Sequence, residues 1–129
     1  MVQQGMMVTF GFHPDRKQAL QDFIHPSGPN CAPYIALLEE LGITQQSWYY
    51  FTPNASAPPQ LGHKLVIVFL PDDATIWFNF IRKAKDQAAH QVVKNAFKTL
   101  PVGTSTGPDF RAVWPDETLY DREVLFTYP

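Results

Sequence analysis

The sequence contains little cysteine and little charge. One of its 129 residues is a cysteine, Cys31, and 17% are charged, with 10 basic and 12 acidic side chains that leave a formal net charge of −2. A single cysteine cannot form an internal disulfide, so we expect the reducing environment of the cytoplasm. The near-neutral balance lacks the clustered positive charge by which proteins bind nucleic acids or anionic membranes. We therefore expect neither nucleic acid nor a membrane as a partner.

Long apolar runs and common ligand motifs are also missing. The longest apolar run, from Leu65 to Leu70, is far too short to span a bilayer. No two histidines stand at the spacing H-x-x-x-H, and neither the dinucleotide fingerprint G-x-G-x-x-G nor a Walker A sequence occurs. We therefore expect no metal and no cofactor.

Aromatic residues and proline are abundant. Aromatics make up 14% of the chain, and its 12 prolines are about twice the usual share of ~5%. So much aromatic surface favours a packed core over disorder. The prolines gather between the expected helices and strands, where they mark connections. With the length, this predicts one domain over residues 1–129.

The spacing of apolar residues predicts an α+β domain. Alternating apolar side chains predict strands, and apolar positions at steps of three and four predict helices. Gly42 would end the second helix, and Asp72 and Asp73 would cap the third. We expect strands at 7–12, 47–52, 64–70 and 122–128, a short extra strand at 110–114, and helices at 16–24, 32–41 and 74–100.

This order is β, α in two pieces, β, β, α, β. It is the split βαβ, or ferredoxin-like, arrangement, in which a four-stranded antiparallel sheet carries its helices on one face. The strand at 64–70 is apolar on both faces, although the free face of such a sheet is normally polar. We therefore expect a second copy of the chain to cover this second face, in a homodimer. The alternative is that the chain's own C-terminal loop covers this face.

Several short motifs follow one another in a suggestive order. His25 precedes the stretch Leu37–Ile43, which reads Leu-Leu-Glu-Glu-Leu-Gly-Ile, and the aromatic strand Trp48–Phe51 comes next. A strand ending near Asp73 and a helix bearing Trp77 complete the series. In this order the chain resembles the dimeric α+β-barrel superfamily, and within it the L-rhamnose mutarotase branch.

The resemblance has implications for function. It implies a dimer formed through one sheet face and a site between the helices and the sheet. It also implies cofactor-free chemistry of the kind that isomerases, cyclases and cofactor-free monooxygenases perform. In the mutarotase branch the histidine before the Leu-Leu motif corresponds to His25, which gives this residue a catalytic role by analogy.

His25 is also the first catalytic candidate on chemical grounds. An imidazole titrates near neutral pH and is therefore the natural general acid or base. His25 stands where a helix breaks, at the expected mouth of a pocket. The alternative is an exposed loop histidine without a role. We expect the histidine at position 63 to be a surface residue.

The aromatic side chains supply the other site candidates. Tyr49 and Tyr50 are expected to join His25 in proton transfer, and Trp48 and Trp77 are expected to bind the ligand. Alternation puts Trp48 and Tyr50 on one face of the strand and Tyr49 on the other, so one set would face the pocket. The alternatives are packing at a dimer interface for the strand residues and core packing for Trp77.

Two functions are compatible with these patterns. The first is a small cofactor-free enzyme that moves protons on a small organic or sugar-like ligand. The second is a non-catalytic module of the same fold that binds a ligand or assembles with a protein partner.

Overall fold

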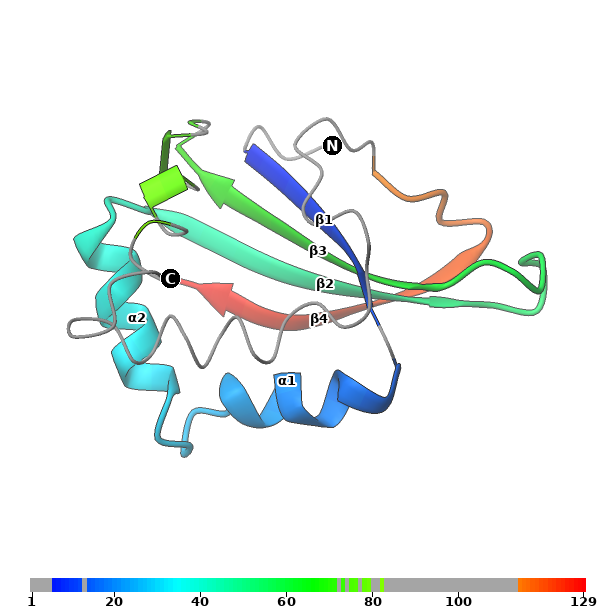
Figure 1. Cartoon of the computed structure of the whole chain (residues 1–129), viewed down its shortest axis with the longest axis horizontal. Coiled ribbons are helices and arrows are strands. Elements are labelled where there is room, and N and C mark those ends of the chain that lie inside the picture. Colours follow the sequence, from blue (N-terminus) through cyan, green and yellow to red (C-terminus); the bar gives the residue numbers. More distant parts are fainter. Residues whose placement is uncertain are drawn as a thin grey trace.

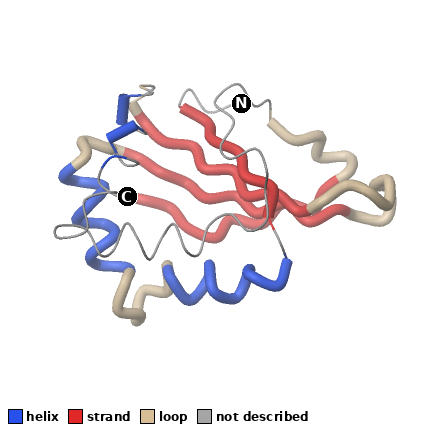
Figure 2. Tube along the Cα trace, in the orientation of Figure 1, coloured by secondary structure: helices blue, strands red, loops and turns tan. Residues whose placement is uncertain are grey.

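The chain builds one antiparallel sheet with helices packed against it. The computed structural model describes residues 6–12, 14–71, 73, 75–76, 78–79, 82 and 114–129. Figures 1 and 2 show the helices beside the sheet, with α1 running alongside β4. Among the helices of the described residues, none is long and apolar enough to cross a membrane. The elements are β1 (Met6–Phe12), a 3-10 turn η1 (Pro14–Arg16), α1 (Lys17–Phe23), α2 (Cys31–Glu40), β2 (Gln45–Pro53), β3 (His63–Leu70) and β4 (Tyr120–Tyr128).

The sheet confirms the α+β class and the four antiparallel strands. Its order is β1-β3-β2-β4, and every neighbouring pair is antiparallel. β1 and β2 therefore run in the same direction with β3 between them, and α1 and α2 connect them as a split βαβ unit. The position of β4 differs from the ferredoxin-like order, in which the last strand lies beside the first. Here β4 lies beside β2, at the opposite edge.

The side chains of β2 explain physically why β4 pairs with β2 at this edge of the sheet. β2 is aromatic on both faces, and β4 brings aromatic rings to both of them. On the helix side Phe126 packs against Trp48, with ring centroids 5.5 Å apart. On the other side Tyr120 packs edge-on against Phe51, at 5.8 Å. Cross-strand pairs of this kind stabilise a sheet.

The pairing of β2 with β4 contains a β-bulge. Trp48 lies opposite Phe126, but its neighbour Tyr49 lies opposite Val124. Leu125 is therefore an extra residue of β4 without a counterpart on β2. From Tyr49 onward the register continues regularly, and Tyr50 lies opposite Glu123. The bulge shifts the alternation of β4 by one position.

The end of α2 follows the sequence prediction. Gly42 has a φ of +80°, a left-handed conformation that glycine adopts without strain. The backbone N–H of Ile43 donates to the carbonyl of Leu38 at 2.9 Å, and that of Gly42 donates to Glu39 at 3.1 Å. These two bonds form a Schellman motif, which satisfies carbonyls at the helix end. The turn directs the chain straight into β2.

The third predicted helix is described only at its start. Residues 75–76, 78–79 and 82 are helical. The Asp73 carboxylate accepts a hydrogen bond from the backbone N–H of Thr75 at 2.9 Å, as expected for a cap. Asp72, the remainder of the helix predicted over 74–100, and the strand predicted at 110–114, except its last residue, lie outside the described residues.

The main core lies between the helices and the sheet and has a polar centre. The side-chain oxygen of Gln46, itself buried, accepts the Tyr34 hydroxyl at 2.7 Å and the Trp48 indole N–H at 3.0 Å. Burial raises the pKa of Tyr34 far above its ordinary value. Among the described residues, the buried side chains of this core are Val8, Leu20, Phe23, Ile24, Tyr34, Leu37, Leu38, Ile43, Trp48, Tyr50, Leu65, Ile67, Phe69, Ile76 and Phe126.

The second face of the sheet has its own cluster. Phe51, Val66 and Val68 are buried there with Tyr120. The partly buried side chains packed against them include Trp114 and Leu119, from the segment just before β4, together with Met7, Tyr49 and Leu61. The two-sided apolarity of β3 is thus accounted for within one chain, by its own C-terminal segment. This observation removes the reason for which the sequence predicted a dimer through this face.

We predict that Val66→Asp prevents stable folding, because Val66 is fully buried and the new carboxylate would have no partner. The expected loss is at least about 3 kcal/mol of unfolding free energy, measured by chemical denaturation. Val124→Asp is the matched control, since Val124 is 52% exposed. It should change stability by no more than about 0.5 kcal/mol. A Val66→Asp protein with native stability would contradict the buried second face.

We also predict that stability falls at alkaline pH through Tyr34. The unfolded chain releases this phenol proton near pH 10, whereas the folded protein holds it to higher pH because burial raises the pKa. The contribution is complete below pH 10 and decreases above it, by up to about 1.4 kcal/mol per pH unit. In Tyr34→Phe, stability should be lower at neutral pH and should decline less steeply above pH 10. Equal slopes in denaturation series from pH 8 to 11 would contradict the assignment.

Candidate functional site

His25 lies in the turn between α1 and α2, and its side chain is exposed. Its Nδ1 accepts a hydrogen bond from the backbone N–H of Ser27 at 3.1 Å. An acceptor nitrogen carries no proton, so the neutral ring of His25 has its proton on Nε2. No hydrogen bond or ring contact joins His25 to Trp48, Tyr49 or Tyr50 in the part of the chain that is described.

The three aromatic candidates of β2 divide between the two faces, as their alternation predicts. Trp48 is fully buried in the main core, where its indole bonds to Gln46. Tyr49 lies on the second face, partly buried, with its ring edge-on to Trp114 at 5.0 Å. Tyr50 lies on the helix side and is fully buried. Trp77 lies outside the described residues.

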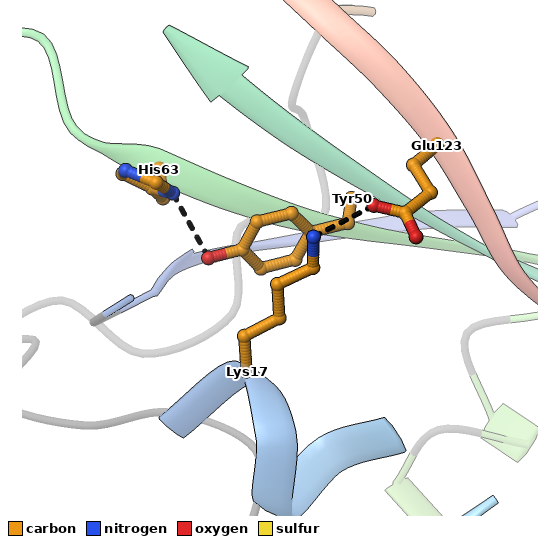
Figure 3. Close-up of polar contacts among 4 residues, drawn as sticks. All are labelled: Lys17, Tyr50, His63 and Glu123. Carbon is orange, nitrogen blue, oxygen red and sulfur yellow. Dashed lines mark hydrogen bonds and ion pairs between the residues drawn. The ribbon is translucent and has the colours of Figure 1, made fainter. Parts of the chain in front are cut away.

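Tyr50 makes a polar contact that the sequence analysis did not anticipate. Its hydroxyl oxygen is 2.9 Å from Nδ1 of His63, at the start of β3 (Figure 3). The centroids of the two rings are 5.7 Å apart. His63 is partly buried, and the Nδ1 edge of its ring faces the Tyr50 phenol. This is the arrangement of an imidazole that a second side chain orients.

An ion pair stands over the same tyrosine. The ammonium of Lys17, the first residue of α1, lies 4.8 Å from the Tyr50 ring centroid. It also donates to a carboxylate oxygen of Glu123 on β4 at 2.7 Å. Figure 3 shows the ammonium over one end of the ring and His63 at the hydroxyl end. Four separate elements thus bring Lys17, Tyr50, His63 and Glu123 together.

The electrostatics keep Tyr50 in its neutral form. Burial raises the pKa of Tyr50, and the nearby Glu123 carboxylate raises it further. Both effects disfavour a phenolate. A neutral phenol can act as a hydrogen-bond partner of the His63 imidazole. The imidazole of His63 is the type of group in this cluster that most often serves as a general acid or base in proteins.

A groove lies at the other end of α1. It has a volume of about 420 Å³ and runs between the α1–α2 turn and the edge strand β4. The buried residue Cys31 forms part of its wall. Its lining is mostly apolar and consists of Ile24, Pro26, Cys31, Ile35, Val124, Leu125, Phe126 and Thr127. None of the predicted aromatic site residues of β2 belongs to this lining.

Metal ligands do not gather within the described residues. No group of three or more histidine, cysteine, aspartate or glutamate side chains among them is placed to hold an ion. The four-residue cluster around Tyr50 contains one carboxylate and one imidazole, and the carboxylate faces the Lys17 ammonium. Groups of these types can transfer protons and pair charges.

Sequence reasoning missed His63, Lys17 and Glu123. The register of the sheet contains the signal that would have found two of them. Tyr50 lies opposite Leu65 on β3, so alternation puts His63, two residues earlier, on the same face and diagonal to Tyr50. Glu123 lies directly opposite Tyr50 on β4. Without the register, His63 could not be distinguished from a surface residue at a strand start.

One further motif in the sequence was also missed. Residues 103–107 read Gly-Thr-Ser-Thr-Gly, which has the form G-x-S-x-G and would make Ser105 the nucleophile of a hydrolase. The motif requires a strand-to-helix turn on a parallel sheet, whereas the neighbouring strands described here are antiparallel. Ser105 itself lies outside the described residues.

Comparison with known proteins gives no family. No protein-family model, no curated protein and no solved structure matches the chain. The functional argument therefore depends on the geometry of the chain itself.

We predict that Tyr50 controls the tautomer of His63. In the wild-type protein, contact with the phenol should bias the proton between the ring nitrogens, which ¹⁵N shifts of the imidazole report. Tyr50→Phe removes this partner, so the His63 shifts should move toward those of free imidazole. His25 is the internal control, because its Nδ1 bonds to Ser27 and should not respond. Unchanged His63 shifts would contradict the contact.

Proposed function

We propose that the chain is a small cofactor-free enzyme that moves a proton on a small organic ligand, in a site between the helices and the sheet. The observation that carries the proposal is the 2.9 Å contact between the Tyr50 hydroxyl and Nδ1 of His63. His63 acts as the general acid or base. Tyr50 is a positioning residue, because it is fully buried and its phenol stays neutral.

The two ring nitrogens of His63 have different tasks in this proposal. The phenol oxygen of Tyr50 can accept a hydrogen bond from Nδ1–H of His63. In this tautomer Nε2 carries the lone pair. This oxygen accepts equally well from the imidazolium, so Nε2 can take up and release a proton while Nδ1 keeps its partner. Fixing the ring in this way holds the base within reach of the proton it abstracts.

His25 is less suited to the same task. The Ser27 backbone N–H occupies its Nδ1, which puts the proton on Nε2, so the exposed nitrogen is a donor and not a base. To act as a base, His25 would have to break this hydrogen bond. We therefore assign the proton transfer that the sequence predicted for His25 to His63.

A non-catalytic function has one observation of its own in its favour. The groove of about 420 Å³ beside β4 has the size of a small-molecule site and is mostly apolar. It lies apart from the Tyr50 cluster, at the other end of α1. A ligand-binding or protein-assembly module would use this groove without any of the proton chemistry.

The finer assignments from the sequence belong to the proposal as well. The split βαβ unit of β1, β3 and β2 supports the dimeric α+β-barrel superfamily, and the Leu37–Ile43 turn into an aromatic strand supports its mutarotase branch. Self-association and a cytoplasmic location are proposed on the same basis. With Val66 and Val68 buried inside one chain, we propose that the interface forms at the edge strand β4, where Val124 is exposed.

The test uses 5-nitrobenzisoxazole, a neutral compound whose ring opens to a coloured phenolate when a base removes its carbon-bound proton. Wild-type protein should accelerate this reaction. His63→Gln should lower the rate at least about 100-fold, since general acid–base groups contribute a factor of this order. Tyr50→Phe should lower it by a smaller factor and alter its pH profile, because the phenol acts through His63.

His25→Gln provides the comparison that decides between the two histidines. Circular dichroism and denaturation first establish that all variants are folded. Retained turnover in His63→Gln with loss in His25→Gln would contradict the assignment. If the wild-type protein has no activity toward this compound or toward the anomeric exchange of reducing sugars followed by NMR, the binding module replaces the enzyme as the proposed function.

A further inference from the structure

We infer that the Tyr50 cluster recognises a ligand through a small oxyanion, a carboxylate or phosphate group, which binds the Lys17 ammonium in place of Glu123. The inference rests on the proposed function in one respect, since it takes His63 as the second contact of the same ligand. It adds the class of substrate, an anionic one, and names the residue that selects it.

Two independent contacts hold the Lys17 ammonium. One is the ion pair with Glu123 at 2.7 Å, and the other is the face of the Tyr50 ring at 4.8 Å. The ring face attracts a cation and cannot move, because Tyr50 is fully buried. If Glu123 turns away, the ring still holds the ammonium in place. Lys17 is therefore a cation that is positioned before any ligand arrives.

The bond between Lys17 and Glu123 is weak enough to be exchanged. The Lys17 and Glu123 side chains are 30% and 48% exposed, and ion pairs with that much solvent contact contribute little stability. Solvent also reaches the carboxylate of Glu123 readily, so it can rotate away without being buried elsewhere. A ligand oxyanion with two or three oxygens can replace it on the ammonium.

The imidazole of His63 lies at the other end of the same ring. His63 touches the Tyr50 hydroxyl, and when its imidazole is protonated it adds positive charge to the site. Glu123 carries the negative charge that opposes an incoming anion at Lys17. An anionic ligand would thus be held at Lys17, with its reacting end near His63. This arrangement favours a small acid that bears its acidic C–H close to the anionic group.

The second face of the sheet offers a matched pair for comparison. Lys64 stands over the ring of Tyr120, with its ammonium 5.7 Å from the ring centroid. Like Lys17, it is a lysine above a buried tyrosine. No imidazole contacts Tyr120 among the described residues, and its hydroxyl has no hydrogen-bond partner there. Lys64 therefore controls for the general effect of removing a lysine from a tyrosine ring.

The probe is inorganic phosphate, titrated at constant ionic strength with chloride as the other anion. Binding is followed through the imidazole resonances of His63, and a saturable shift is expected. Lys17→Met keeps an alkyl cover over Tyr50 but should abolish saturation. Lys64→Met should bind like the wild type. Glu123→Gln should bind about two- to fivefold more tightly, because the competing carboxylate is gone.

The outcomes separate this inference from the proposed function. If turnover of the neutral 5-nitrobenzisoxazole depends on His63 but phosphate does not bind saturably, the inference of an anionic ligand is wrong and the proposed enzymatic function stands. If phosphate binding depends on Lys17 but turnover does not depend on His63, the proposed enzymatic function is wrong and the anion-binding site stands. Weaker binding in Glu123→Gln, or equal loss in Lys17→Met and Lys64→Met, overturns the exchange of Glu123 for the ligand.

Discussion

The side-chain carbonyl of Gln46 is the point on which the packing of this domain depends. It accepts one hydrogen bond from Tyr34 on α2 and one from Trp48 on its own strand, inside a core that excludes water. A buried donor left without its acceptor costs about 1–3 kcal/mol, so α2 has one favourable position over β2. The rings of Phe23 and Phe126 pack around this position, each within 6.5 Å of Trp48. Tyr50, two residues along the same face, is thereby directed past the aromatic core toward His63.

The pleat of β2 separates two neighbouring tyrosines that have similar surroundings. Each has a cation over its ring, Lys17 for Tyr50 and Arg122 for Tyr49. Their other neighbours differ, because the Tyr50 hydroxyl reaches the imidazole of His63, whereas the Tyr49 ring packs edge-on against the indole of Trp114. The helix side therefore holds groups that can exchange a proton, and the second face holds rings that bind the C-terminal segment to the sheet. One strand serves both purposes because its side chains alternate.

Local patterns in the sequence predicted the elements well and their pairing poorly. Alternation located all four strands to within about two residues, and Gly42 located the end of α2, because these signals act over a few residues. The edge at which β4 pairs and the covering of Val66 depend on contacts between distant parts of the chain, which periodicity does not report. The same limit applies to the site. Tyr50 was recognisable as a strand tyrosine with a polar end, but its partners come from β3, β4 and α1 and could be found only with the register known.

The β-bulge at Leu125 determines on which face of the sheet the Glu123 carboxylate lies. Phe126 is held on the helix side by Trp48, and in a regular ladder the residue opposite Tyr50 would then be Val124. Glu123 would lie opposite Phe51, on the face away from Lys17. The single extra residue shifts the alternation of β4 by one position, so Phe126 and Glu123 both lie on the helix side. If the same sequence paired without the bulge, Phe126 would still lie on Trp48, but the Glu123 carboxylate would lie on the opposite face of the sheet, away from Lys17.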